Sequence, residues 1–181
     1  KLNNAKGLFK VTDGIYQVRG YDLANMTLVE GNTGWIVIDP LLTAEIAKAT
    51  LAFALDKLGS KKPVVAVIYT HSHADHFGGV RGVINEADVL AGKVKVIAPE
   101  GFMDNAIAEN VLAGNAMTRR ATYQFGNGLD ANPRQGVGSG LGKALGAGTM
   151  GLIPPTDTVN KTGQEMTVDG VRIRFQMAQG S

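Results

Sequence analysis

The amino-terminal part of the chain consists of short hydrophobic runs separated by glycine-containing turns. The runs, which favour β-structure, cover residues 15–18, 26–30 and 35–38. Gly20 separates the first run from the second, and Gly31 separates the second from the third. Glycines are common where a strand ends and a turn begins. The pattern predicts an antiparallel meander.

A helical pattern follows this meander. Asp39 and Pro40 end the third run, and apolar residues then recur at mainly helical spacing over residues 43–58. Thr43 is suited to cap the helix at its start, and Gly59 is suited to end it. The pattern predicts a helix of about four turns.

The middle of the chain alternates apolar runs with helical patterns. Residues 64–69 form a continuous apolar run, which is typical of a strand buried on both faces by helices. Residues 94–98 predict a second buried strand, and the residues between them, 80–90, predict a helix. Residues 100–120 predict one or two helices with a break at 110–114. The order of elements indicates an α/β fold.

The last third begins with a glycine-rich stretch and ends with a hairpin pattern. Residues 126–151 contain nine glycines and little hydrophobic periodicity, which predicts a flexible loop. Two strand patterns, 165–168 and 171–176, then flank an Asp169-Gly170 turn, the strongest hairpin pattern in the chain. We therefore expect residues 1–181 to form a single domain.

The composition of the chain excludes several classes of function and of metal ligand. The 18 basic and 16 acidic residues are interspersed, so the chain lacks the basic stripe that grips nucleic acid. Its apolar runs are all shorter than the roughly 20 residues that span a bilayer, so we expect no membrane span. Cysteine is absent, and a metal would therefore be held by histidine and carboxylate.

All three histidines of the chain lie in one window directly after a predicted strand: His71, His73 and His76, with Asp75 among them. Residues two apart in an extended chain point the same way, so His71 and His73 can converge on one ion. A turn into helix would place Asp75 and His76 beside them. These ligands suit zinc, and iron or manganese would accept them.

Two metal ions a few ångström apart can share a hydroxide and make it a nucleophile near neutral pH. The pattern therefore predicts a hydrolase, in which the four side chains of residues 71–76 hold the metals and the metal-bound water. The alternative interpretation is a polar loop without a ligand. Gly78 and Gly79, which follow the cluster, favour the metal site.

Other polar residues are weaker candidates. Asp39, at the end of an earlier strand, could orient a ligand imidazole, or it could simply form the turn before Pro40. Thr70 could support the same ligands, or be an ordinary β-branched strand end. Arg119 and Arg120 could attract an anionic group of a substrate, although adjacent arginines near a helix end are more often solvated.

The run from Thr70 to Gly79 resembles the metal-binding motif of the metallo-β-lactamase superfamily. That resemblance implies an αβ/βα sandwich with the site at the strand edges. Further blocks resemble the zinc-dependent alkyl sulfatase branch of this superfamily; they cover residues 20–26, 98–102, 109–111, 117–121, 140–142 and 152–156.

What this resemblance implies is hydrolysis of linear alkyl sulfate esters, such as dodecyl sulfate, to an alcohol and inorganic sulfate. His71 and His73 would hold one Zn2+ and Asp75 and His76 the other, giving two zinc ions in a complete site. A metal-activated water would be the nucleophile. The family also implies a homodimer, and a periplasmic or secreted location in bacteria.

The resemblance further implies metal ligands that this chain lacks. In the family, glutamates and a histidine come from downstream, the first just beyond residue 181. Four side chains cannot fill two metal shells of about four ligands each. We therefore expect the amino-terminal half to two-thirds of the sandwich, inactive until the remaining part of the enzyme supplies its ligands.

Two rival hypotheses stay open. Another hydrolase of the same superfamily, acting on a β-lactam, a thioester or a phosphodiester, would use the same activated water. An inactive metal-binding fragment would instead pack against a separate chain that carries the missing ligands, because half a sandwich exposes a large apolar face.

Overall fold

The computed structural model describes residues 5–126, 128–130, 132 and 146–178. Within them, a seven-stranded sheet has its strands in sequence order, and a separate two-stranded sheet follows. The strands are β1 (Gly7–Thr12), β2 (Ile15–Arg19), β3 (Met26–Glu30), β4 (Trp35–Ile38), β5 (Val64–Ile68), β6 (Lys95–Pro99), β7 (Asp157–Val159), β8 (Glu165–Val168) and β9 (Val171–Arg174). The predicted meander and hairpin are confirmed, whereas β1 and β7 were not predicted.

The large sheet changes from antiparallel to parallel at β4. Strands β1 to β4 pair antiparallel, and β4 to β7 pair parallel. The carboxyl ends of parallel neighbours lie at one edge of a sheet, and Ile38 at the end of β4 pairs with Ile68 at the end of β5. The residues that follow these two strands are therefore brought together.

Helices connect the parallel strands. They are α1 (Ala44–Leu58), α2 (Ala74–Phe77), α3 (Glu86–Leu90), α4 (Phe102–Ile107) and α5 (Gly114–Phe125), with a 3₁₀ turn, η2 (Val80–Gly82), and a π turn, η3 (Ala108–Leu112). Thr43 caps α1 and Gly59, at φ 60°, ends it, which confirms the prediction. The helix predicted at 80–90 is interrupted, because the Asn85 side chain accepts a hydrogen bond from Ala87 N–H and starts α3 there.

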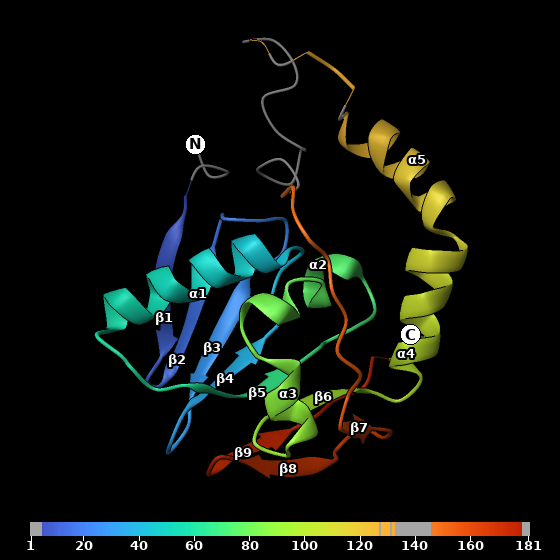
Figure 1. The fold of residues 1–181 in the computed structure, drawn as a ribbon. Helices are drawn as coiled ribbons and strands as arrows, with labels where there is room; N and C mark the ends of the chain where they lie inside the picture. The colour runs from blue at the N-terminus through green and yellow to red at the C-terminus, as the bar shows by residue number, and fades with distance from the viewer. Residues whose placement is uncertain (1–4, 127, 131, 133–145, 179–181) are drawn as a thin grey trace.

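The two faces of the sheet have different covers. Helices α1, α2 and α3 lie on one face, and the β8–β9 hairpin lies under the other (Figure 1). Successive residues of β4 alternate accordingly: Trp35 and Val37 pack in the first core, and Ile36 packs with the hairpin residue Val168 in the second. The apolar strand runs are thus explained by a helical layer and a hairpin, and not by helices on both faces.

The glycine-rich stretch is described only at its ends. Residues 127, 131 and 133–145, which make up most of the predicted flexible loop at 126–151, lie outside the described residues. Beyond them the chain crosses back over the helices. Thr149 N–H donates to Glu45 Oε2 at 2.8 Å, and Gly151 N–H donates to the Gly78 carbonyl oxygen at 2.7 Å. Among the described residues, no helix has the length and hydropathy that a membrane crossing requires.

Asp169 fixes the β8–β9 hairpin to the β3–β4 turn. Its Oδ2 accepts hydrogen bonds from the N–H groups of Thr33 and Gly34, each 2.8 Å long, and its Oδ1 accepts one from Thr33 Oγ1. Desolvation raises the pKa of Asp169, but these hydrogen bonds and the nearby Lys62 charge lower it by more than that. The pKa of Asp169 is therefore below its ordinary value.

Acid is expected to loosen this hairpin contact. Because the folded-state pKa of Asp169 is lowered, its contribution to stability is complete above the unfolded-state pKa of about 3.9 and is lost as the pH falls through the folded value. Urea unfolding midpoints should therefore fall below about pH 4. Asp169→Asn should have a lower midpoint at neutral pH and a shallower acid dependence; equal pH profiles for the two proteins would contradict the assignment.

Candidate metal centre

The three histidine rings converge where the chain leaves β5 and enters α2. The ring centroids of His71 and His76 are 4.1 Å apart, and those of His71 and His73 are 4.6 Å apart. Asp75 Oδ2 lies 3.4 Å from His76 Nε2. The strand end and the following helical turn thus bring together the four side chains that the sequence singled out.

Asp39 joins this cluster from the neighbouring strand end. It is 8% exposed and adopts a φ of 57°, in the left-handed region. Its Oδ1 accepts a hydrogen bond from Thr70 N–H at 2.9 Å, and its Oδ2 accepts one from Thr70 Oγ1 and lies 2.8 Å from His76 Nδ1. Asp39 therefore supports the histidine segment and is more than a turn residue.

The hydrogen bonds assign tautomers to two of the rings. A carboxylate only accepts, so His76 Nδ1 carries the hydrogen that it donates to Asp39. The Thr70 hydroxyl uses its single hydrogen on Asp39, so at its 2.9 Å contact with His71 Nδ1 it accepts from the ring. Nε2 is then the atom that each of these imidazoles offers to a metal.

The ionisable groups of the cluster perturb one another. Desolvation lowers the pKa of His76, but hydrogen bonds to Asp39 and Asp75 outweigh it and raise the pKa to about 9. Desolvation, followed by the neighbouring imidazoles, lowers the pKa of His71. For Asp75, desolvation raises the pKa, and the hydrogen bond with His76 brings it below its ordinary value. A metal bound at His76 Nε2 would have to displace a proton from that atom.

Gly78 and Gly79 allow α2 to lie directly against the loop that follows β4. A Cβ at Gly78 would collide with the Leu42 carbonyl oxygen, and one at Gly79 with the Pro40 carbonyl oxygen. The Gly79 N–H also donates to the Leu41 carbonyl oxygen at 2.8 Å. The glycines after the histidines thus serve backbone contact between the Asp39 loop and the histidine helix.

The donor set fits a metal, although the side chains do not yet surround one. In the part of the chain that the structure describes, no three His, Asp or Glu side chains converge closely enough to hold one ion. Imidazole nitrogens and a carboxylate are nevertheless the ligands that zinc takes. The His71 ring centroid lies 4.1 Å from that of His76 and 4.6 Å from that of His73, so the imidazole donors are already close to one another.

The remaining candidates divide differently. Arg119 and Arg120 are exposed on α5, and among the described residues neither makes a hydrogen bond or ion pair with the cluster. Their role as anion contacts stays a prediction. Glu109, in contrast, lies with its Oε1 3.4 Å from His73 Nε2. The sequence offered Glu109 only as part of a block resembling the alkyl sulfatases, because no local spacing relates it to His73.

A cavity of about 690 Å³ opens beside the histidines. His71 and His73 line it on the side of the cluster, together with Thr70. The rest of its wall is largely apolar and includes Ile97, Phe102, Val159, Phe175 and Met177. The site therefore places imidazole donors beside a largely apolar cavity.

Comparison with curated proteins finds long and close relatives. The chain is 58% identical over 181 residues to the linear primary-alkylsulfatase of a Pseudomonas species, which covers 100% of the chain and 27% of that protein. It is 52% identical over 181 residues to the alkyl/aryl-sulfatase BDS1 of Saccharomyces cerevisiae, covering 100% of the chain and 28% of that protein. The chain thus spans little more than a quarter of the length of these relatives.

A solved structure and a family model are also similar to this chain. The stereoselective inverting sec-alkylsulfatase Pisa1 from Pseudomonas sp. superposes with a TM-score of 0.90 at 51% identity, covering 97% of this chain and 28% of that one. The family model described as the metallo-beta-lactamase superfamily matches residues 19–166, which contain the histidine cluster and Asp39. The chain belongs to the metallo-β-lactamase superfamily.

Proposed function

We propose that this chain carries the first half of the active site of an alkyl sulfate hydrolase, which releases an alcohol and inorganic sulfate. The observation that carries the proposal is the 58% identity, across all 181 residues, to a protein named linear primary-alkylsulfatase. The similarity spans the whole chain, so the matched region contains the cavity wall as well as the ligand motif. It favours alkyl sulfates over the β-lactams, thioesters and phosphodiesters that the ligand motif alone would also allow.

In this proposal the metals are two zinc ions, with His71 and His73 contributing to one and Asp75 and His76 to the other. Zinc, when bound, would supply a water of lowered pKa as the nucleophile. The chain itself orients the ligands: Asp39 holds the His76 ring, and Thr70 holds the His71 ring. The apolar cavity beside His71 and His73 suits a substrate with a hydrocarbon tail.

The proposal requires ligands from outside these residues. Two zinc shells need about four ligands each, and the cluster offers four side chains in all. The relatives are more than three times as long as this chain, since it covers 27% and 28% of them. We expect residues 1–181 alone to bind metal weakly and to release no sulfate, and the complete gene product to assemble the site, as the homodimer that the family resemblance implies.

Sulfate release tests the function. The complete gene product, loaded with Zn2+, should release inorganic sulfate from dodecyl sulfate, should lose this activity in a chelator and should regain it when Zn2+ is restored. The same preparation should leave a β-lactam, a thioester and a phosphodiester intact. Zinc-loaded protein that turns over one of those substrates and not alkyl sulfates would overturn the proposal.

A further inference from the structure

The π turn η3 directs an acidic side chain at the second histidine of the cluster. Glu109 Oε1 lies 3.4 Å from His73 Nε2, and the Glu109 side chain is 23% exposed. The neighbouring Leu112 is 81% exposed and Val111 69%. The turn therefore presents its carboxylate inward and its apolar side chains outward, the reverse of what helix packing alone would select.

The next residue ties the same turn to the histidine segment. Asn110 Nδ2 donates to the Ser72 carbonyl oxygen at 3.2 Å and to the Ala106 carbonyl oxygen at 2.9 Å. Consecutive residues of η3 thus contact consecutive residues of the histidine segment. A π turn inserts one residue into a helix and rotates the side chains that follow, a distortion found often at functional sites.

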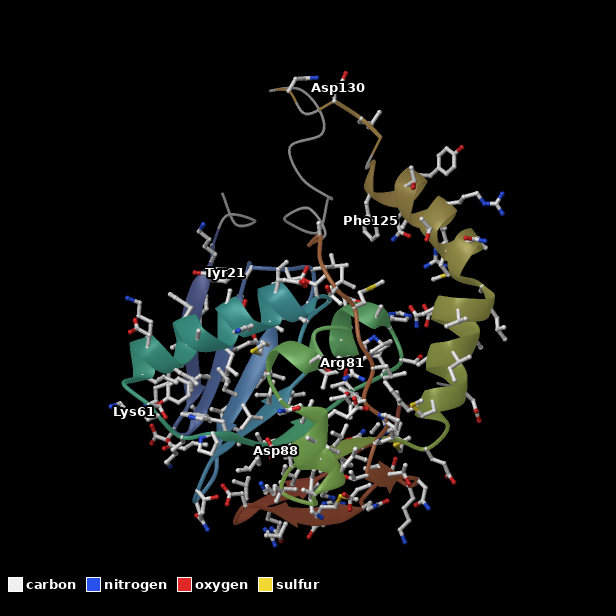
Figure 2. The ribbon with its side chains drawn as sticks, viewed as in Figure 1. Tyr21, Lys61, Arg81, Asp88, Phe125 and Asp130 are labelled. Atoms are coloured by element: carbon white, nitrogen blue, oxygen red, sulfur yellow. The ribbon has the colours of Figure 1, made fainter. Side chains whose placement is uncertain are left out.

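Helix α5, which follows η3, has no comparable contact with the sheet or the helices that cover it. Among its described residues, α5 has none that is buried, and it extends away from the sheet beyond η3 (Figure 1). Phe125 marks its far end in Figure 2, well separated from the strands. Within the described part of the chain, side-chain contacts with the histidine segment are made by η3 and not by α5.

We propose that Glu109 is a positioning residue, whose carboxylate accepts a hydrogen bond from His73 Nε2–H and so leaves Nδ1 of that ring to bind the metal. The inference rests on the metal centre of the proposed function. An approach of about 0.3 Å converts the 3.4 Å contact into a hydrogen bond of ordinary length. Carboxylates that orient ligand histidines in this way fix the tautomer and raise the basicity of the ligand.

The assignment makes the three rings complementary. His71 and His76 are held at Nδ1, by Thr70 and Asp39, and offer Nε2. His73 is held at Nε2 and offers Nδ1. Nδ1 lies closer to the backbone than Nε2 does. His71 and His73 can therefore direct nitrogens at different distances from the backbone toward the same metal centre.

Metal affinity tests this role independently of turnover. In the complete gene product, Glu109→Ala should weaken the tightest Zn2+ or Co2+ binding by about 10-fold, measured by competition with a chromophoric chelator. Glu109→Gln keeps an oxygen that accepts from Nε2–H and should restore most of the affinity. Alanine favours helix more than glutamate does, so the metal-free Tm should not fall. Asp104→Asn, which changes an exposed acid on α4, is the matched control and should leave the metal affinity unchanged.

The possible results distinguish the positioning role of Glu109 from the proposed function. Unchanged affinity in Glu109→Ala, or an equal loss in the Asp104→Asn control, would overturn the inference. A Co2+ absorption spectrum altered as strongly by Glu109→Gln as by alanine would also overturn it, because Glu109 would then be a direct ligand. If the parent protein hydrolyses no alkyl sulfate and the affinity still follows the Glu109 series, the proposed substrate fails and the positioning role stands.

Discussion

Replacing Gly79 with alanine is expected to destabilise the protein by about 3 kcal/mol and to disperse the histidine cluster. The new Cβ would lie 2.7 Å from the Ala47 Cβ and 2.8 Å from the Thr43 carbonyl oxygen, and closer still to the Pro40 carbonyl oxygen. Two of these neighbours are backbone oxygens, that of Pro40 in the loop after β4 and that of Thr43 at the start of α1, so they cannot yield by a rotamer change. The Asp39 loop and α2 would have to separate, and that separation breaks the support of His76.

Gly114→Ala is the matched control for this substitution. A Cβ there would meet nothing within 4 Å, so the added methyl group is expected to leave stability unchanged or raise it by up to about 1 kcal/mol. Thermal and urea unfolding of both variants, with Zn2+ titrated into each, measure the effect. Similar stabilities for the two alanine variants would show that the loop and α2 are not in the close contact described above.

Replacing Asp39 with alanine is expected to weaken metal binding by as much as about 100-fold. The carboxylate fixes His76 directly and His71 through the Thr70 hydroxyl, so its loss releases two rings at once. It also leaves Thr70 N–H without its acceptor on Asp39. Asp39→Ala should therefore show a larger loss of affinity than any change that affects one ring.

The measurement for Asp39 is a chelator competition with Zn2+ together with metal-free thermal unfolding. Asp88→Ala, which removes an exposed carboxylate paired with Lys93 at 3.4 Å, is the comparison and should bind Zn2+ as the parent does. An Asp39→Ala protein with parental metal affinity would mean that the His76 ring is held by other contacts.

Local patterns predicted a large part of this fold. Helix α1 was bounded correctly at Thr43 and Gly59 because its caps are single residues with strong backbone preferences. The β8–β9 hairpin was found from Asp169 and Gly170, both of which adopt positive φ. Strand β7 was missed because its three residues, one of them Asp157, are too few to show a period.

The site was predictable only as far as its members are close in sequence. The spacing of the three histidines and Asp75 within residues 71–76 is enough to predict a metal site. Asp39 could be interpreted from the sequence either as a turn residue or as a residue that orients a ligand imidazole. The pairing of β4 with β5, which brings it to His76, is a tertiary contact that local sequence does not reveal. Glu109 lies farther along the chain, and only the path of α4 and the π turn brings it to His73.

The contacts of the imidazoles have a consequence for biosynthesis. Every hydrogen bond and ion pair that the structure gives these rings, among the described residues, is made to Asp39, Thr70, Asp75 or Glu109. A ribosome has delivered all of these groups by the time residue 109 leaves its exit tunnel, and domains form from the amino terminus while translation continues. The nascent polypeptide can therefore orient these imidazole nitrogens while residues 110–181 are still being added or are still inside the ribosome.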